Sequence, residues 1–327
     1  MTTTGGIQFK GFTLSPFQQK AAAALREGRD VLVAAPTGAG KTLVAEYAIH
    51  RALERGQRAI YTAPIKALSN QKFRDFRADP EIADAGLMTG DVTLHPDARV
   101  LVMTTEILRN TLFEDPAKLH DVGAVVFDEI HYMDDVERGS VWEETLIFLK
   151  EDVEIVGLSA TIANLGQFAA WLEKVRKRPM AVVEERKRPV PLKHYLYHPK
   201  VGVFPPSRLK NISKRFAGRK KDRSWHRRDD GPLLDSLEER ELLPTLYFCF
   251  SRKLCERKAR QEGRSRRLLN KSEAQQVLEV WAQAEEEFGF DSNRGSLSEL
   301  KSMTVRGVAA HHAGMLPLHK EMVERLF

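Results

Sequence analysis

The sequence of 327 residues contains only two cysteines, Cys249 and Cys255. So few thiols exclude a disulfide-stapled secreted scaffold, and a reducing compartment fits this composition. Residues 1–6 lack a basic flank followed by an apolar run, so no secretory signal is predicted. No apolar stretch approaches the ~18 residues that a membrane-spanning helix requires. We therefore expect a cytoplasmic protein that has no membrane partner.

The sequence also lacks the ligand spacing of a metal cage. Cys249 and Cys255 are not accompanied by a second cysteine pair, which argues against zinc, and we expect both to be packing residues. His311 and His312 are adjacent, and adjacent side chains in a strand point to opposite faces of a sheet. These residues therefore do not indicate a zinc site.

The totals are those of an ordinary globular protein, with 42% hydrophobic and 29% charged residues. The length predicts about two domains. The formal net charge of +6 mildly favours a polyanionic partner. Basic residues crowd the segment 199–230, which is either a source of non-specific phosphate contacts or a solvated linker.

The segment Val31–Thr42, VLVAAPTGAGKT, has the order of a P-loop: a short apolar strand, a glycine-containing turn and the start of a helix. Such a loop turns successive backbone N–H groups toward a phosphate chain, and the helix N-terminus favours the same negative charge. In this motif the lysine neutralises the β- and γ-phosphates and the following hydroxyl holds Mg²⁺. The first glycine of the usual pattern is replaced by alanine. The predicted ATP-binding residues are Ala35, Pro36, Thr37, Gly38, Ala39, Gly40, Lys41 and Thr42.

A glutamine precedes the P-loop. Ser15 and Pro16 predict a helix start, which places Gln18 in its first turn. An amide both donates and accepts hydrogen bonds and so matches the edge of adenine. Gln18 alone is more simply a solvated helix residue, but the nearby P-loop favours an ATP contact.

Two carboxylates follow the apolar run that begins at Gly123. Beside a P-loop, Asp128 is predicted to hold Mg²⁺ together with Thr42, and Glu129 to orient and deprotonate the attacking water. With Lys41, this pair predicts ATP hydrolysis. An ordinary acidic pair at a strand end is the alternative, which the P-loop makes less attractive.

Apolar runs alternate with helical stretches along the first part of the chain. Strands are expected within residues 58–63, 86–91, 98–109, 123–131 and 154–161. This alternation predicts an α/β fold with a doubly wound parallel sheet, as in P-loop NTPases.

Several ordered segments together resemble the motifs of superfamily 2 DExH-box helicases. The segments are residues 35–42, 63–70, 104–109, 128–131 and 159–161, together with Gln18. The run Asp128–Glu144 and residues 188–192 and 307–317 are similar to the Ski2-like branch in particular.

The resemblance implies a motor built from RecA-like domains. The first domain would span residues 8–185, and residues 186–240 would form a linker that contains the basic insertion. Residues 241–327 would form an incomplete second RecA-like domain that opens with a strand at Leu243–Ser251. The implied cofactors are ATP and Mg²⁺, and the implied partner is single-stranded RNA or DNA. RNA is favoured by the branch resemblance only, as are RNA-processing partners.

The resemblance also implies roles for individual residues. The residues that would face the nucleic-acid strand are Pro64, Lys66, Ala67, Asn70, Gly90, Thr104, Thr105 and Arg109. His131, Ser159 and Thr161 would couple the ATP site to domain movement. From the residues alone, helix capping explains Ser159 and Thr161 equally well, and His131 is an ordinary loop histidine.

The family's arginine-finger motif, Gln-x-x-Gly-Arg-x-Gly-Arg, does not follow His312. Residues 261–267 imitate its composition, but they precede His311 and are in the wrong order. We therefore expect the N-terminal portion of a helicase, truncated before that motif. Two alternatives remain: a catalytically silent module that binds ATP and nucleic acid, and a P-loop ATPase that remodels protein complexes.

Overall fold

The computed structural model describes residues 6–90, 92–160, 164–198, 200–216 and 231–327. The chain divides into two units, Met1–Leu192 and Lys193–Phe327. No helix among the described residues is long and apolar enough to cross a membrane.

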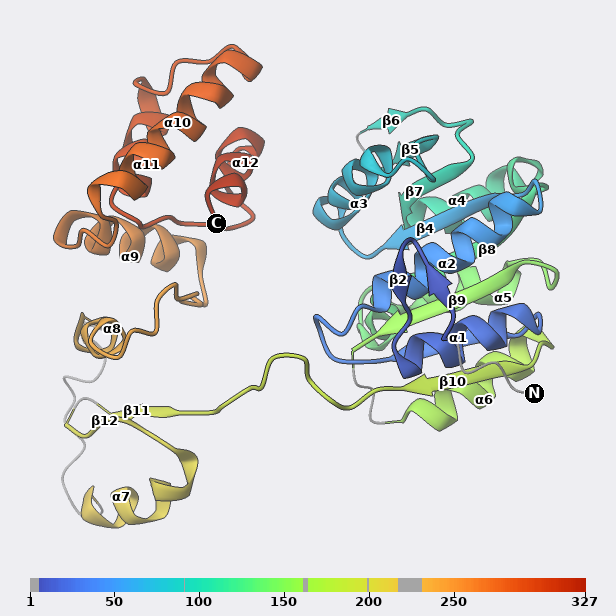
Figure 1. The fold of residues 1–327 in the computed structure, drawn as a ribbon, viewed down its shortest axis with the longest axis horizontal. Coiled ribbons are helices and arrows are strands. Elements are labelled where there is room, and N and C mark those ends of the chain that lie inside the picture. The colour runs from blue at the N-terminus through green and yellow to red at the C-terminus, as the bar shows by residue number, and fades with distance from the viewer. Residues whose placement is uncertain (1–5, 91, 161–163, 199, 217–230) are drawn as a thin grey trace. The chain divides into compact units, whose positions relative to one another are not determined.

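The first unit is built on an eight-stranded sheet with the order β10-β3-β9-β8-β4-β7-β5-β6 (Figure 1). All neighbouring strands are parallel except β5 and β6, which are antiparallel. The strands are β3 (Asp30–Ala34), β4 (Arg58–Ala63), β5 (Ala85–Met88), β6 (Thr93–Leu94), β7 (Val100–Thr104), β8 (Val122–Phe127), β9 (Glu154–Ser159) and β10 (Met180–Glu184). The predicted doubly wound parallel sheet is confirmed, whereas β10, which pairs with β3, was not anticipated.

Helices cover both faces of this sheet (Figure 1). One face packs against α1 (Pro16–Arg26), α2 (Lys41–Glu54) and α3 (Lys66–Ala78). The other packs against α4 (Thr105–Glu114), α5 (Gly139–Phe148) and α6 (Leu165–Arg176). A small hairpin, β1 (Gln8–Phe9) with β2 (Phe12–Thr13), and two 3₁₀ helices, η1 (Pro116–Leu119) and η2 (Ile130–Asp134), complete the unit.

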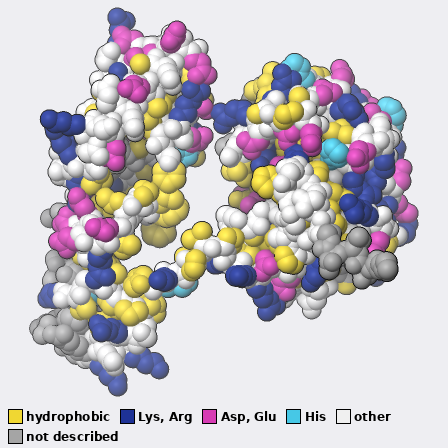
Figure 2. Space-filling model, in the orientation of Figure 1, with side chains coloured by type: hydrophobic (Ala, Val, Ile, Leu, Met, Phe, Trp, Pro, Cys, Tyr) yellow, Lys and Arg dark blue, Asp and Glu magenta, His cyan; other side chains and the backbone are white. Residues whose placement is uncertain are grey.

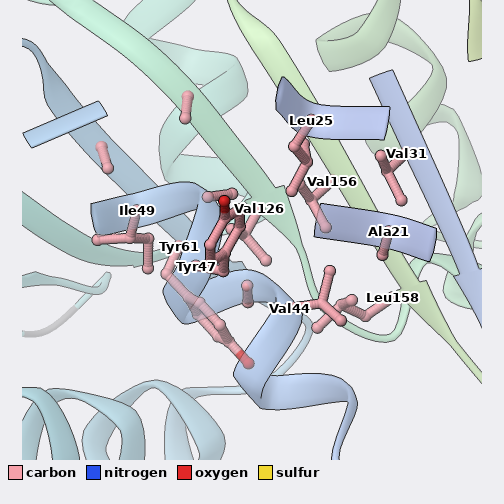
Figure 3. Close-up of a cluster of buried hydrophobic side chains, with 14 of the residues drawn as sticks. Ala21, Leu25, Val31, Val44, Tyr47, Ile49, Tyr61, Val126, Val156 and Leu158 are labelled. Atoms are coloured by element: carbon pink, nitrogen blue, oxygen red, sulfur yellow. The ribbon is translucent and has the colours of Figure 1, made fainter. Parts of the chain in front are cut away.

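The two cores arise from the alternation of side chains along each strand. In β3, Val31 and Val33 belong to one core, while Leu32 and Ala34 belong to the other. Because successive strand residues point to opposite faces, an uninterrupted apolar strand is stable only with helices on both sides. Figure 3 shows the first of these cores, in which helix residues such as Leu25 meet strand residues of the sheet.

The second unit is mostly helical. It contains a two-stranded antiparallel pair, β11 (Leu196–His198) and β12 (Gly202–Phe204), the 3₁₀ helix η3 (Pro206–Arg208), and the helices α7 (Leu209–Phe216), α8 (Gly231–Glu238), α9 (Arg252–Ser265), α10 (Lys271–Phe288), α11 (Gly295–Thr304) and α12 (Pro317–Leu326). A small core surrounds Trp281, whose indole N–H donates to Thr304 Oγ1 over 3.0 Å. The apolar side of α10 therefore packs into this core.

The strand predicted at Leu243–Ser251 is not formed, and residues 243–250 have no regular secondary structure. A parallel strand needs hydrogen-bonding neighbours, and the only described strands of this unit, β11 and β12, pair with each other. Apolar side chains of the segment are exposed in consequence, with Phe248 85% accessible, and Figure 2 shows hydrophobic side chains on this unit.

His311 and His312 are likewise outside any strand. Each imidazole lies beside a carboxylate: His311 Nε2 is 3.0 Å from Glu324 Oε1, and His312 Nε2 is 3.2 Å from Glu256 Oε1.

The basic segment 199–230 is described only in part, because residues 199 and 217–230 lie outside the described ranges. The described part, residues 200–216, includes β12, η3 and α7. This part of the segment therefore has regular secondary structure, and its phosphate contacts and its role as a linker both stay predictions.

Candidate ATP and nucleic-acid sites

The P-loop joins the end of β3 to the start of α2. Gly38 and Gly40 adopt φ values of +81° and +88°, a region that residues with a side chain rarely enter. Gly40 is the N-cap of α2, and a Cβ atom built on it would lie only 2.8 Å from Gln18 Nε2. Glycine at this position therefore meets two demands, the left-handed backbone and the close approach of Gln18.

Gln18 lies in the first turn of α1, which begins at Pro16 after Ser15 as predicted. Its Oε1 accepts from the Ser15 backbone N–H over 2.8 Å, and its Nε2 donates to the Gly40 carbonyl over 2.9 Å. Only 7% of the residue is exposed. Gln18 thus joins the start of α1 to the P-loop, and its contact with adenine stays a prediction.

Lys41 is the first residue of α2, and its ammonium folds back over the loop. Nζ donates to the carbonyl oxygens of Ala35, over 2.7 Å, and Pro36, over 3.2 Å. Burial lowers the pKa of Lys41, and the negative charges of Glu129 and Asp128 oppose that effect. The P-loop lysine and the acidic pair therefore lie within electrostatic range of each other.

The acidic pair follows β8 directly. The Asp128 backbone N–H donates to the Thr62 carbonyl over 2.9 Å, which fixes the end of β8 against β4. Glu129 adopts φ +51° and ψ +43°, a left-handed conformation that costs a residue with a side chain about 1–3 kcal/mol. Burial, reinforced by the Asp128 charge, raises the pKa of Glu129, while His131 and Lys41 oppose the increase. A raised pKa suits a carboxylate that accepts a proton from water.

His131 connects two of the predicted residues. Its Nδ1 lies 3.3 Å from Glu129 Oε2 and 3.3 Å from Ser159 Oγ. Ser159 ends β9, and its carbonyl accepts from the Ala35 N–H over 3.1 Å. Ser159 is not a helix cap, since Asn164 is the N-cap of α6. Thr161, the third predicted coupling residue, lies outside the described residues.

The residues expected to face a nucleic-acid strand divide into two groups. Lys66, Asn70 and Gly90 are exposed, and a Cβ atom on Gly90 would lie 3.6 Å from Lys66 Nζ. Pro64, Thr104 and Thr105, in contrast, are buried. Pro64 follows the carboxyl end of β4, Thr104 ends β7, and Thr105 begins α4. The contact of these three residues with a strand stays a prediction.

Arg109 and Ala67 complete that set. Arg109 Nε donates to Glu144 Oε2 over 2.7 Å and Nη1 to Asn110 Oδ1 over 3.2 Å, so part of its guanidinium is engaged within the protein. The side chain of Ala67 lies outside the described structure.

Comparison with known proteins agrees with this geometry. Residues 15–168 match the model of the DEAD/DEAH box helicase family. This part of the chain is a DEAD/DEAH box helicase domain. The chain is 40% identical to an uncharacterized helicase, C17H9.02, and 39% identical to the ATP-dependent RNA helicase mtr4, both of Schizosaccharomyces pombe. It is 41% identical to the probable helicase HelY of Mycobacterium leprae.

Each of these alignments covers 97% of this chain, but 32%, 31% and 38% of the respective relative. The chain thus spans about a third of the length of these relatives. The recognition of a Ski2-like DExH-box helicase sequence is confirmed.

The donor set of the helicase domain fits Mg²⁺. Mg²⁺ prefers oxygen ligands and is usually bound by one or two carboxylates together with substrate phosphates and water. No group of three or more histidine, cysteine, aspartate or glutamate side chains among the described residues forms a metal cage. The Thr42 hydroxyl and the Asp128 carboxylate are the oxygen ligands that would hold the ion. When bound, it would neutralise charge on the β- and γ-phosphates.

Tyr61 is a residue of the helicase domain's site that sequence reasoning missed. It is fully buried in β4, and its hydroxyl donates to Asp128 Oδ2 over 2.5 Å. Burial, reinforced by the Asp128 charge, raises the pKa of Tyr61 well above its ordinary value, so the hydroxyl stays a donor. A tyrosine within an otherwise apolar buried strand needs a hydrogen-bond partner, and that requirement was the available signal.

Proposed function

We propose that this chain is the ATP-hydrolysing part of a Ski2-like helicase that moves along single-stranded nucleic acid, with ATP and Mg²⁺ as cofactors. The observation that carries the proposal is the meeting of the P-loop with the acidic pair. Lys41 interacts electrostatically with both carboxylates, and Glu129 contacts His131, which in turn contacts Ser159.

Each residue then has a defined task. The backbone N–H groups around Gly38 and Gly40 and the N-terminus of α2 would bind the phosphates, and Lys41 would exchange its carbonyl partners for the β- and γ-phosphates. Glu129 would orient the attacking water and accept its proton. Gln18 would position adenine, and Ala35 to Thr42 would enclose the phosphate chain.

His131, Ser159 and Thr161 would transmit the state of the ATP site. His131 touches both Glu129 and Ser159, and the Ser159 carbonyl accepts from the Ala35 N–H of the P-loop. A change at the γ-phosphate would alter these contacts together. Such contiguous contacts are the physical route by which a local change can move a larger element.

The strand would bind at the carboxyl edge of the sheet. Lys66, Asn70 and Gly90 are exposed there, and Arg109 is half-buried nearby on α4. Contacts of this kind hold backbone phosphates without reading the bases. RNA is the favoured strand because the S. pombe relative mtr4 is named an RNA helicase, and RNA-processing partners are proposed on the same ground.

The domain boundaries belong to the same proposal: 8–185 for the first RecA-like domain, 186–240 for the linker and 241–327 for part of a second. The low cysteine content of the sequence supports a reducing, cytoplasmic setting.

Steady-state ATP hydrolysis by residues 1–327, with and without single-stranded RNA or DNA, tests the proposal, with Lys41→Ala as the inactive control. Hydrolysis that nucleic acid stimulates and Lys41→Ala abolishes is the expected result. ATP binding without turnover would instead identify a silent ATP- and nucleic-acid-binding module. Turnover indifferent to nucleic acid would favour an ATPase that remodels proteins.

A further inference from the structure

Arg138 lies between η2 and α5 and has no role in the site described above. Its Nη2 donates to the Pro64 carbonyl over 2.7 Å, and its Nε donates to Glu106 Oε1 over 3.0 Å. A further bond joins Nη2 to the same Glu106 oxygen. The guanidinium also lies 5.6 Å from the ring centroid of Trp142, a fully buried side chain.

The backbone that carries Arg138 is itself held in place. Asp135 Oδ1 accepts from the N–H groups of Glu137 and Arg138, each over 2.9 Å, and the Asp135 carbonyl accepts from Gly139 N–H over 2.8 Å. A Cβ atom on Gly139 would lie 2.1 Å from the Met133 carbonyl oxygen, so the turn packs as closely as glycine allows. Arg138 is therefore a fixed anchor rather than a mobile surface side chain.

The two acceptors belong to the segments proposed to meet the nucleic-acid strand. Pro64 follows β4 and leads into α3, which begins at Lys66. Glu106 lies in the first turn of α4, the helix that carries Arg109. Arg138 thus joins the starts of two helices that follow neighbouring strands, β4 and β7.

Arg138 also lies close in sequence to the acidic pair of the proposed ATP site. η2 begins at Ile130, immediately after Glu129, and the turn at Asp135 follows it. Tyr132, within η2, stacks on Trp142 with ring centroids 6.2 Å apart, and Trp142 lies beneath Arg138. The segment that follows the catalytic carboxylates is therefore packed against the anchor.

We propose that Arg138 is a positioning residue for nucleic-acid binding, which holds the Pro64 and Glu106 segments in the geometry that receives the strand. The inference rests on the proposed function, since it assumes that this edge binds nucleic acid. The guanidinium of Arg138 makes three N–H···O contacts to Pro64 and Glu106 within the protein. Arg138 would therefore act by holding these two acceptors in place and not by binding phosphate.

The charge of Glu106 gives a test in which the two explanations predict opposite changes in nucleic-acid affinity. A carboxylate at the strand-binding edge would repel phosphate, so its neutralisation alone should strengthen binding. If the tie to Arg138 positions the edge, Glu106→Gln should weaken binding instead, because a neutral amide forms a weaker bond with the guanidinium.

The experiment is the affinity of the 1–327 chain for a fluorescein-labelled single-stranded RNA, by anisotropy, over a series of salt concentrations. Arg138→Gln is expected to weaken binding about tenfold, as the loss of charge-assisted hydrogen bonds would. The slope of log K against log [salt] should stay the same, because each lost phosphate contact would change it by about 0.7. Glu106→Gln should weaken binding in the same way, and ATP affinity should stay within about twofold in both variants.

Arg58→Gln is the matched control. Arg58 also bridges a carboxylate and a carbonyl, since its Nε lies 3.4 Å from Asp121 Oδ1 and its Nη2 donates to Lys118 O over 3.4 Å. It begins β4 and so lies at the opposite end of that strand from Pro64. Its substitution should leave RNA affinity unchanged.

Two results would overturn the inference: a shallower salt slope in Arg138→Gln, which would make Arg138 a phosphate ligand, or tighter binding by Glu106→Gln. Unchanged affinity in Arg138→Gln would overturn it as well. Failure of the wild-type chain to bind RNA or single-stranded DNA would contradict the proposed function itself and is distinguishable from all three.

Discussion

Strand β4 and residues 243–250 are similar in apolar character but differ completely in structure. β4 lies between β7 and β8, and its residues 59–63 are buried. Residues 243–250 have no neighbouring strand among the described residues, and Leu246 and Phe248 are 64% and 85% exposed. The difference shows that an apolar run becomes a strand only where other strands supply its hydrogen bonds and helices cover its faces.

The two units also differ in the chemistry that they are proposed to carry out. Residues 6–192 contain the large sheet, both major cores and all of the proposed ATP site. Among the described residues of the second unit, one small core cluster contains the buried side chains of Trp281, Ala284, Leu300 and Met322. Substitutions in the two units should therefore separate catalysis from local stability.

The largest effect is expected from Glu129→Gln. An amide cannot accept the proton of the attacking water, so turnover should fall by about 10²- to 10⁴-fold. ATP and Mg²⁺ should still bind, which a fluorescent nucleotide titration would verify. Turnover close to that of the wild type would show that Glu129 is not the base.

A pair of tryptophans compares the two cores directly. Trp142→Ala should lower the free energy of unfolding of the first unit by about 3–5 kcal/mol, because a large buried side chain is lost. Trp281→Ala should shift only a transition of the second unit and leave ATP affinity unchanged. Chemical denaturation followed by circular dichroism and by nucleotide fluorescence would check both, and loss of ATP binding in Trp281→Ala would contradict the separation.

Tyr61→Phe should have an intermediate effect. The change removes the hydroxyl that holds Asp128 Oδ2, and the loss of an outer-shell partner typically weakens metal affinity about 10- to 100-fold. More Mg²⁺ should be needed to bring a fluorescent ATP analogue to half-saturation.

Tyr47→Phe is the control for that measurement. Tyr47 belongs to the same core as Tyr61, and its hydroxyl accepts from Arg26 Nε over 2.6 Å. An equal change in Mg²⁺ dependence in the two variants would show that Asp128 positioning is not the cause.

The smallest effect is expected from Phe250→Ser. Phe250 is fully exposed, so its replacement should alter the free energy of unfolding by no more than about 0.5 kcal/mol. A loss of several kcal/mol in thermal or chemical denaturation would mean that residues 243–250 are packed in solution.

Much of the first unit could be predicted because its signals are local. The bounds of β4 were predicted correctly, since an apolar run between Gly56 and Pro64 has both ends marked. The P-loop and the acidic pair could be predicted because their spacing reflects the chemistry of phosphate and Mg²⁺.

The rest could not be predicted because long-range packing decides it. The junction of β7 and α4 buries Thr104 and Thr105, and the order of residues along the chain does not report this burial. The ties from Tyr61 to Asp128 and from Arg138 to Glu106 join residues that are 67 and 32 positions apart, and no local pattern reports such contacts.

The central claim is that the P-loop and the acidic pair form one ATP·Mg²⁺ site within this chain. Calorimetric titration of ATP with Mg²⁺ into wild-type and Lys41→Ala chains tests it most directly. The account predicts saturable binding at one site in the wild type and its loss in Lys41→Ala. Equal affinity in the two chains would contradict it.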